Sequence, residues 1–225
     1  MIPRRRGGAA ASYARARLPP PHTPWRDARY CVVDLELSGL DPRHGEVISY
    51  AALAIDEGRI VLASAVAGLV HPTRPLAEES IRIHGIRAAD LAQAPELSEA
   101  IKPLLAAMTG RILIAHHAPV ERAFLRRALR SAGARLRRPV LDTAVLARLW
   151  LAERDGALPA QAELGELARA CGLPVHAPHT AAGDALTTAQ LFLACASALD
   201  ALRPETVRSL ARARGRLVNV ETYWR

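Results

Sequence analysis

Several features are scarce in this sequence, and each scarcity narrows the class of protein. The 225-residue chain has three cysteines, and Cys31, Cys171 and Cys195 are too far apart to match the short spacings of zinc sites. No uninterrupted apolar run reaches the ~18 residues of a membrane-spanning helix, and no internal repeat is present. The sequence therefore favours a reduced, cytoplasmic compartment without membrane association. At 50% hydrophobic residues, it is long enough for one α/β domain with short extensions.

Lysine is almost absent, because Lys102 is the only lysine among 30 basic residues. The formal net charge of +8 comes from the two ends of the chain. Residues 1–29 carry a net charge of +6, residues 201–225 carry +4, and residues 30–200 carry −2. Basic ends could hold a phosphate backbone by counterion release. Arginine enrichment beside abundant alanine is equally typical of a biased genomic base composition, so both interpretations stay open.

The first 29 residues contain RRRGG, AAAS and PPPHTP and show no helical or strand periodicity. They predict a basic, flexible or loosely attached extension. After Arg6 come Gly, Ala and Tyr with further arginines rather than an apolar core, which argues against an export signal. The sequence thus predicts an extension at 1–29, one domain at 30–200 and a basic C-terminal helix or tail at 201–225.

Two carboxylates interrupt a run of strand-forming residues, YCVVDLEL, at 30–37. Side chains two positions apart on a strand point to the same side, so Asp34 and Glu36 present their oxygens on one face, beside the turn at Ser38. Two like charges in a half-buried site repel and are costly to desolvate. A divalent cation such as Mg²⁺ relieves both effects, because it takes hard oxygen ligands. For this motif alone, a solvated strand end with an accidental D-x-E spacing is the simpler interpretation.

The remaining pattern predicts the order of strands and helices. Alternating apolar residues predict strands at 47–55 and 59–70, and strands joined by such short turns must be antiparallel neighbours. Short apolar strands are predicted at 111–115 and 140–141, and helices at 77–84, 97–108, 120–132, 143–153, 163–170 and 181–199. This order predicts an α/β fold with a mixed sheet covered by helices. Asp142 is a predicted N-cap of the helix that follows it, with a second role left open.

Two further candidate sites lie at helix starts. His179 and Asp184 would be about 140° apart around a helix, so they can converge only if His179 lies in the loop before the last helix. Glu121 falls in the first turn of the 120–132 helix, near the carboxyl end of a strand, where ligand sites of α/β folds collect. Singly, each has an ordinary explanation as a loop histidine, a helix-dipole partner or a surface glutamate. The same helix carries arginines on or near one exposed face, namely Arg122, Arg126, Arg127 and Arg130.

Taken in order, these segments resemble a known family. Asp34-x-Glu36, a carboxylate at 121 after a histidine-rich turn, and His179-x4-Asp184 resemble the three motifs of the DEDDh 3′–5′ exonucleases. That family contains the proofreading epsilon subunit of bacterial DNA polymerase III, ribonuclease T and oligoribonuclease. Supporting segments that also resemble the family are Leu40-Asp41-Pro42, His84-Gly85-Ile86, Leu141-Asp142-Thr143 and residues 185–189. The resemblance covers about residues 30–200 and implies an RNase H-like fold, a mixed five-stranded sheet flanked by helices.

The sequence departs from the family pattern in two motifs. Leu37-Ser38-Gly39 stands where the family usually has Thr-Thr-Gly, and HHAPVE at 116–121 stands where it usually has His-Asn-x-x-Phe-Asp. Glu121 keeps the carboxylate but is one methylene longer, which affects its fine placement at the metal. Loss of the family's Asn and Phe affects the grip on the terminal nucleotide more than the chemistry. The chain also shows no long tail like the one by which the epsilon subunit joins its polymerase. That favours an enzyme acting alone or recruited differently.

The resemblance implies a hydrolase with two Mg²⁺ or Mn²⁺ ions per active site. Two ions about 3.5–4 Å apart supply a nucleophile at neutral pH and neutralise charge on the leaving oxygen. Asp34 would bridge the ions, and Glu36 with Asp184 would complete the first site. Glu121 would hold the second ion directly or through water. His179 would be the general base, since an imidazole can take a proton from water near neutral pH.

The resemblance also suggests residues that contact the substrate. Ser38 and Leu40 resemble the family positions that meet the sugar and base of the terminal nucleotide. A tight turn and a core leucine explain these two residues equally well. Gly39, His84 and His117 are the further substrate-binding candidates.

The implied substrate is the 3′ end of single-stranded nucleic acid, with DNA preferred by resemblance, and a DNA polymerase or repair complex is a candidate partner. An exoribonuclease of the same family would keep every feature of this sequence, because contacts to a 2′-hydroxyl are local geometry. A catalytically degenerate nucleic-acid-binding module would explain the altered second motif and the basic ends, but not the retention of four acids and His179. The sequence does not determine the oligomeric state.

Overall fold

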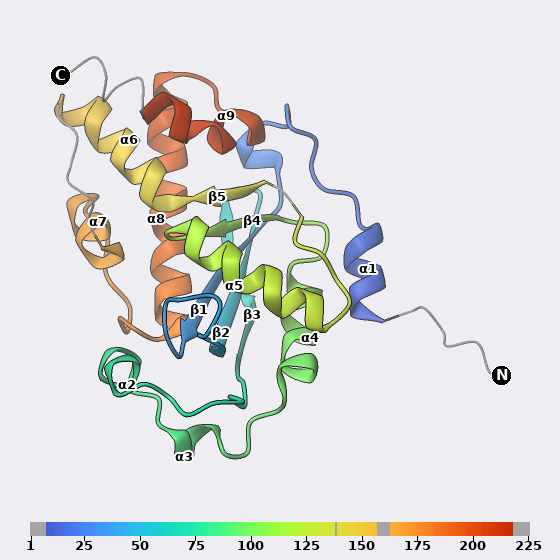
Figure 1. Cartoon of the computed structure of the whole chain (residues 1–225). Helices are drawn as coiled ribbons and strands as arrows, with labels where there is room; N and C mark the ends of the chain where they lie inside the picture. The colour runs from blue at the N-terminus through green and yellow to red at the C-terminus, as the bar shows by residue number, and fades with distance from the viewer. Residues whose placement is uncertain (1–7, 138, 157–162, 218–225) are drawn as a thin grey trace.

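The computed structural model describes residues 8–137, 139–156 and 163–217 (Figure 1). Every strand and helix predicted between residues 30 and 199 is present, with ends shifted by a few residues. Three helical segments were not predicted, namely α1 (Ala9–Arg15), η1 (Trp25–Asp27) and α3 (Ala88–Leu91). The other elements are β1 (Tyr30–Leu37), β2 (Val47–Asp56), β3 (Arg59–Leu69), α2 (Glu78–His84), α4 (Leu97–Ala107), β4 (Ile112–Ala115), α5 (Ala118–Ser131), β5 (Val140–Asp142), α6 (Thr143–Asp155), α7 (Leu164–Ala170), α8 (Ala181–Leu202) and α9 (Val207–Ala211).

The five strands form one mixed sheet in the order β3-β2-β1-β4-β5. β1 pairs antiparallel with β2, and β2 with β3, as the short turns predict. β4 pairs parallel with both β1 and β5, and parallel neighbours need crossover connections, which run through α4 and α5. The carboxyl ends of β1, β4 and β5 therefore lie at the same edge. The predicted mixed five-stranded sheet is confirmed.

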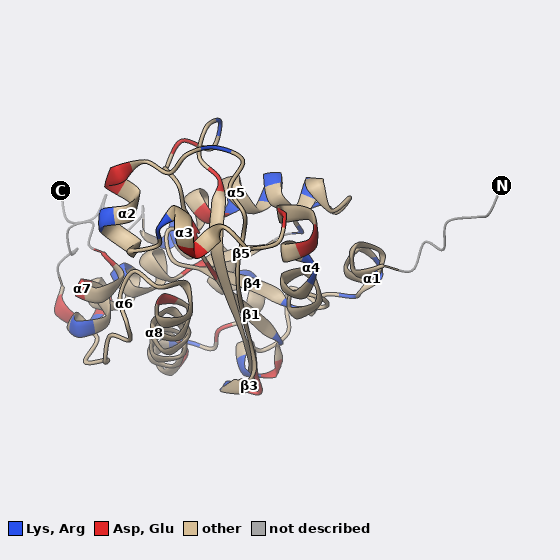
Figure 2. Cartoon of the chain, turned by 90° about the horizontal axis from the view of Figure 1, so that it is seen from below, with Lys and Arg blue, Asp and Glu red and all other residues tan. Residues whose placement is uncertain are grey.

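Alternation along β1 divides its side chains between two cores. Tyr30 and Val32 belong to the core that contains α6 and α8, whereas Cys31 belongs to the core built with α4 and α5. Figure 2 shows the same division, with α6, α7 and α8 on one side of the sheet and α1 and α4 on the other. Asp34 and Glu36 continue the even-numbered series of β1, so their side chains point toward the α8 side.

In the described ranges, α8 is the one helix long and apolar enough, by length and composition alone, to cross a membrane. Its window has a mean hydropathy of 1.4, although Asp184 and Gln190 interrupt the apolar run. The prediction that no uninterrupted apolar run is long enough to span a membrane therefore holds. Judged by its mean hydropathy instead, α8 is long and apolar enough. Half of this window is buried inside the domain, where α8 packs on β1, β2 and α6. Core packing is sufficient to explain its apolar character.

Residues 8–29 are packed against the domain, which corrects the prediction of a loosely attached extension for this part. Tyr13 of α1 is 2% exposed and joins the core on the α4 side. Trp25 of η1 is 1% exposed and meets Phe192 of α8 edge to face. The Arg137 guanidinium donates to the backbone carbonyls of Tyr13 and Ala16. Single buried aromatic residues follow no periodic pattern, so the sequence did not predict this attachment. The predictions for 1–7 and 218–225 lie outside the described residues.

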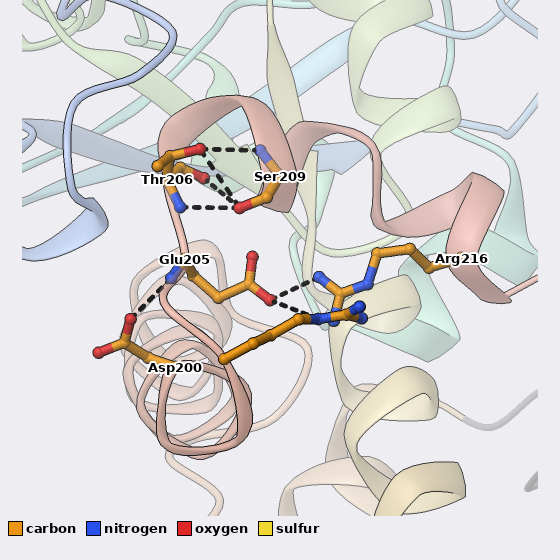
Figure 3. A network of polar contacts seen from close by, with 6 residues as sticks. Asp200, Glu205, Thr206, Ser209 and Arg216 are labelled. Atoms are coloured by element: carbon orange, nitrogen blue, oxygen red, sulfur yellow. Dashed lines mark hydrogen bonds and ion pairs between the residues drawn. The ribbon is translucent and has the colours of Figure 1, made fainter.

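A buried acid joins the C-terminal segment to α8 and to the N-terminal segment (Figure 3). Glu205 is 2% exposed, and its Oε1 lies 2.6 Å from Arg216 Nη1 and 3.6 Å from Arg203 Nε. Its backbone N–H donates to Asp200 of α8 at 2.8 Å, and its carbonyl accepts from the Trp25 N–H at 3.1 Å. Glu205 therefore connects Trp25, near the start of the described chain, and Arg216, near its end, to the C-terminal end of α8.

Candidate active site

The four predicted acids converge at the carboxyl end of β1. Asp34 and Glu36 on β1 and Asp184 in the first turn of α8 each offer an oxygen, and these oxygens lie within 4.8 Å of one another. Glu121, in the first turn of α5, is 7% exposed. Burial raises the pKa of Asp34 well above its ordinary value, and the charges of Glu121, Asp184 and Glu36 raise it further. Three distant segments thus build one acidic cluster.

The cluster is electrostatically unbalanced. Burial and the charge of Asp184 raise the pKa of Glu36 from 4.5 to about 7. The pKa of Glu121 is raised by burial and by Glu36, against a hydrogen bond from the Leu35 N–H, and burial raises the pKa of Asp184. Among the described residues, no lysine or arginine forms an ion pair with any of the four. Like charges therefore meet without a lysine or arginine paired with them.

These acids fit a divalent metal. Oε2 of Glu121 is buried and has no hydrogen-bond partner in the described structure. A buried oxygen without a partner costs free energy, more so when it carries charge. Mg²⁺ and related hard cations take carboxylate oxygens as ligands. Crowded carboxylates and an unpartnered oxygen are the features that such an ion would satisfy.

The loop before α8 brings His179 to the same place. Its backbone N–H donates to Asp184 Oδ2 at 3.0 Å, and its positive charge lowers the pKa of Glu36 and Asp184. His179 has φ +61°, a region that non-glycine residues rarely adopt. Gly183, which the sequence reading missed, explains how the loop fits, because a Cβ there would collide with the carbonyl oxygens of 176–177. A glycine just before the motif's aspartate was the available signal.

A pocket of about 290 Å³ opens beside Glu36. Its walls include most of the predicted substrate-binding residues, namely Ser38, Gly39, Leu40 and His84. Leu40 is 76% exposed and Ile83, which was not predicted, is 54% exposed. The alternative of a core leucine at position 40 is therefore wrong. The alternative of a turn at Ser38 describes the structure, since its Oγ accepts the Glu46 N–H at 2.9 Å. A substrate contact by Ser38 stays a prediction.

The two predicted histidines have different surroundings. His84 is buried in the pocket wall, where its Nδ1 accepts the Ile86 N–H at 3.0 Å and burial lowers its pKa. Its Nε2 has no partner among the described residues. His117 precedes α5 with φ +50°, and its ring meets that of His116 at a centroid distance of 4.5 Å. His117 does not line the pocket beside Glu36, so the structure separates these two candidates.

Comparison with known proteins bears on this arrangement. Residues 31–192 match the family model described as Exonuclease (RNase T). The chain belongs to the exonuclease family. This confirms the predicted resemblance.

Two relatives and one solved structure illustrate the similarity within the exonuclease family. A DNA polymerase III subunit epsilon-like protein of Rhodobacter capsulatus is 35% identical over 202 residues, 87% of this chain and 28% of that protein. The DNA polymerase III subunit epsilon of Aquifex aeolicus is 28% identical over 168 residues, 74% of this chain and 80% of that protein. Exonuclease X, solved with 5′-overhanging duplex DNA, has a TM-score of 0.63 at 22% identity, over 83% of this chain and 99% of that chain. The fold is therefore shared, and the predicted RNase H-like class is confirmed.

One buried residue near the second exonuclease motif received no role from the sequence. His116 Nδ1 lies 2.9 Å from the Thr143 hydroxyl. Burial, aided by the charge of His117, lowers the pKa of His116 to about 3, so its ring is neutral at physiological pH. His116 thus ties the end of β4 to the start of α6. His116 and Thr143 are 27 positions apart, so no local pattern in the sequence indicates this contact.

Proposed function

We propose that this chain is a metal-dependent 3′–5′ exonuclease that hydrolyses phosphodiester bonds from the 3′ end of single-stranded nucleic acid, with DNA preferred. One observation carries the proposal. Four carboxylates that pair with no lysine or arginine among the described residues converge with His179 at the end of a central strand in a chain of the exonuclease family. Removing nucleotides from such a strand requires hydrolysis of a phosphate diester, for which this donor set is suited.

The roles proposed for the acids are those that the family resemblance implies, and the convergence of the four carboxylates supports them. Asp34, Glu36 and Asp184 would hold one divalent ion, and Glu121 would bind a second together with Asp34. When bound, Mg²⁺ or Mn²⁺ ions supply charge neutralisation at the phosphate and make water a better nucleophile near neutral pH. His179 would accept a proton from the attacking water, since it is exposed and its backbone N–H is bonded to Asp184 of the cluster.

The pocket beside Glu36 would hold the terminal nucleotide. Leu40 and Ile83 offer exposed apolar side chains for contact with the base, and the buried His84 forms part of the wall of the same pocket. Gly39 leaves open space on that side, because a Cβ there would meet nothing within 4 Å. His117 does not line this pocket.

A degradation assay tests the activity. Single-stranded DNA and RNA of equal sequence, labelled at the 5′ end, are incubated with the purified chain and Mg²⁺ or Mn²⁺. We expect a ladder that shortens from the 3′ end, faster on DNA than on RNA, and suppressed by a chelator. Faster loss of RNA would favour the exoribonuclease alternative. Intact strands that nevertheless bind would support the degenerate module and overturn the proposal.

The names of the relatives support a protein partner. Both curated relatives are named for DNA polymerase III, so we propose a DNA polymerase or repair complex as the assembly that uses this chain. Affinity purification of the chain from its own cells would test this. Recovery of a replicative or repair polymerase in stoichiometric amount would support it, and recovery of the chain alone would count against it.

A further inference from the structure

Four arginines form a cationic row that begins next to the acidic cluster. Arg122, Arg126 and Arg130 recur every four residues along α5, and Arg135 follows in the loop after it. Side chains four apart lie on the same helix face, and these four line one open pocket of about 380 Å³ together with Leu136. Figure 2 shows basic residues on the outer side of α5. We call these four residues the arginine track.

The track has no structural task within the described chain. None of its four side chains forms a hydrogen bond or ion pair with another described residue. Arg127, on the same helix, is different, because its guanidinium donates to the carbonyls of Pro42 at 3.2 Å and Gly45 at 3.1 Å and so holds the loop between β1 and β2. Cations that gather without acids repel one another. The track is therefore complementary to a polyanion rather than to its own fold.

The position of the track relates it to the site. Arg122 follows Glu121 directly, and the row then extends about 12 Å along α5 at 1.5 Å per residue. The pocket beside Glu36 is walled by the 36–40 segment and by residues 77–84, with no residue of α5. A strand whose last nucleotide fills that pocket and whose last diester lies at the acids would continue over α5. The arginines would then meet successive phosphates.

We propose that the arginine track binds the sugar-phosphate backbone of the nucleic-acid strand on the 5′ side of the nucleotide that is removed. The inference rests on the proposed function for the direction of the strand. Guanidinium groups form charge-assisted, often bidentate hydrogen bonds with phosphate oxygens. Contacts to phosphates carry no sequence information, so the track would bind strands of any nucleotide sequence.

Salt-dependent binding tests the proposal. The full chain in constant Mg²⁺ is titrated with a 5′-fluorescent single strand that is long enough to extend along α5 and carries uncleavable phosphorothioate linkages at its 3′ end. Each phosphate contact contributes about −0.7 to the slope of log K against log salt for single strands. The slope of log K against log salt should be less steep by about 2.8 in a fourfold variant, at about 0.7 for each of four contacts. This variant carries Arg122→Gln, Arg126→Gln, Arg130→Gln and Arg135→Gln. In the double variant Arg126→Gln and Arg130→Gln, the same slope should be less steep by about 1.4. Both side chains are exposed, so these substitutions should not disturb folding.

Arg59→Gln is the control for loss of one surface charge, and it is compared with Arg126→Gln alone. Arg59 is exposed on β3, at the sheet edge opposite β5, so each of these two variants removes one exposed positive charge. The slope for Arg59→Gln should equal that of the unmodified chain, and an equal loss there would overturn the track as a defined site. Slopes of the track variants that superimpose on the parent slope would also overturn it. Polyglutamate that displaces the strand as well as unlabelled DNA does would assign the surface to acidic proteins instead.

Cleavage separates the two proposals. The ratio of kcat/KM on the long strand to kcat/KM on a dinucleotide should fall in the track variants, because a dinucleotide is too short to follow α5. A chain that cleaves DNA with an unchanged ratio and slope would keep the proposed function and lose the track. A chain that does not cleave, but whose salt slope depends on the four arginines, would keep the track and lose the proposed function.

Discussion

Two groups of buried carboxylates in this molecule are balanced in opposite ways. Glu205 has a fully buried side chain, and it lies 2.6 Å from Arg216 and 3.6 Å from Arg203 (Figure 3). Asp34 and its three acidic neighbours crowd together with only a histidine to offset them. The first arrangement supplies its own cations and ties the C-terminal segment to the domain. The second has no lysine or arginine paired with it among the described residues.

The pKa values of the four clustered acids are raised, as expected for carboxylates that are not paired with a lysine or arginine. An acid whose pKa is raised holds its proton to higher pH, because the fold disfavours the charged form. Glu36, with a pKa of about 7, is partly protonated at neutral pH when no metal is bound. Metal binding must displace such protons. The fold thus disfavours the charged forms of the acidic cluster, whereas Glu205 lies beside two arginines.

The largest expected effect is on catalysis. Asp34→Asn and Asp184→Asn each remove a proposed metal ligand while preserving shape, and we expect cleavage to fall by about a thousandfold or more, equivalent to about 4 kcal/mol. Thermal unfolding in a chelator should show equal or greater stability, because removing one charge relieves repulsion. A variant that is much less stable without metal would mean that these acids are structural and would remove the contrast with Glu205.

The next effect concerns pH. The ordinary pKa of Glu36 is 4.5 and the folded value is about 7, so the folded state binds more protons between these values. The free energy of unfolding of the metal-free chain should therefore fall as pH rises from about 4.5 to about 7, by about 3 kcal/mol from this group. Calorimetry in a chelator at several pH values measures the fall. Glu36→Gln should flatten the curve, and added Mg²⁺ should raise the melting temperature more at pH 8 than at pH 5.

At Glu205, which is paired with Arg203 and Arg216, a substitution should lower the free energy of unfolding rather than the rate of cleavage. Glu205→Gln removes the acid shared by two arginines, one of which, Arg216, has a side chain 19% exposed. We expect a loss of about 2 to 3 kcal/mol, toward the low side of values for broken buried pairs because the arginines keep some solvent, or roughly 5 to 10 °C in melting temperature. Turnover per folded molecule should not change.

Arg203→Gln is the control for the paired site, since its side chain is 53% exposed at 3.6 Å from Glu205, and exposed pairs contribute under about 1 kcal/mol. Equal losses for Glu205→Gln and Arg203→Gln would show that burial does not set the strength of this network. A fall in turnover with unchanged stability would instead connect the network to the active site.

The sequence predicted the elements of the site because each motif lies at a boundary that local pattern reveals. A strand period placed Asp34 and Glu36 on one face, and the break before α8 placed His179 in a loop and Asp184 in a first turn. The structure brings them together as this placement required. Their roles in catalysis stay predictions, since geometry alone does not assign them.

Other features depended on contacts between distant segments. The attachment of residues 8–29 rests on single aromatic side chains, and the Tyr13 hydroxyl accepts the Arg137 N–H across 124 positions at 3.2 Å. The pocket gains Ile83 from α2, and the arginine track gains Arg135 from a loop. None of these contacts leaves a periodic trace in the sequence. Only the tertiary fold determines them.

Asp142 represents a third way to accommodate a buried acid, because backbone N–H groups satisfy it. Its Oδ1 accepts the Ala144 N–H at 3.1 Å, which confirms the predicted cap of α6. Burial raises its pKa, while hydrogen bonds from the N–H groups of Ala144 and Ala118 lower it. The charges of His117 and Arg214 act in the same direction as these bonds. Asp142 therefore stands between the unbalanced cluster and the paired Glu205.

The smallest expected effect distinguishes a cap from a member of the active site at Asp142. Asp142→Ala removes the acceptor and should cost about 1 kcal/mol, whereas Asp142→Asn should cost only a few tenths, because asparagine caps helices about as well as aspartate. If capping is its whole role, both variants should cleave single-stranded DNA at the parent rate with unchanged dependence on Mg²⁺. Chemical denaturation combined with the degradation assay measures both properties. A rate that collapses in Asp142→Asn at near-parent stability would mean that the carboxylate charge matters, and Asp142 would then join the unbalanced acids as a fifth member.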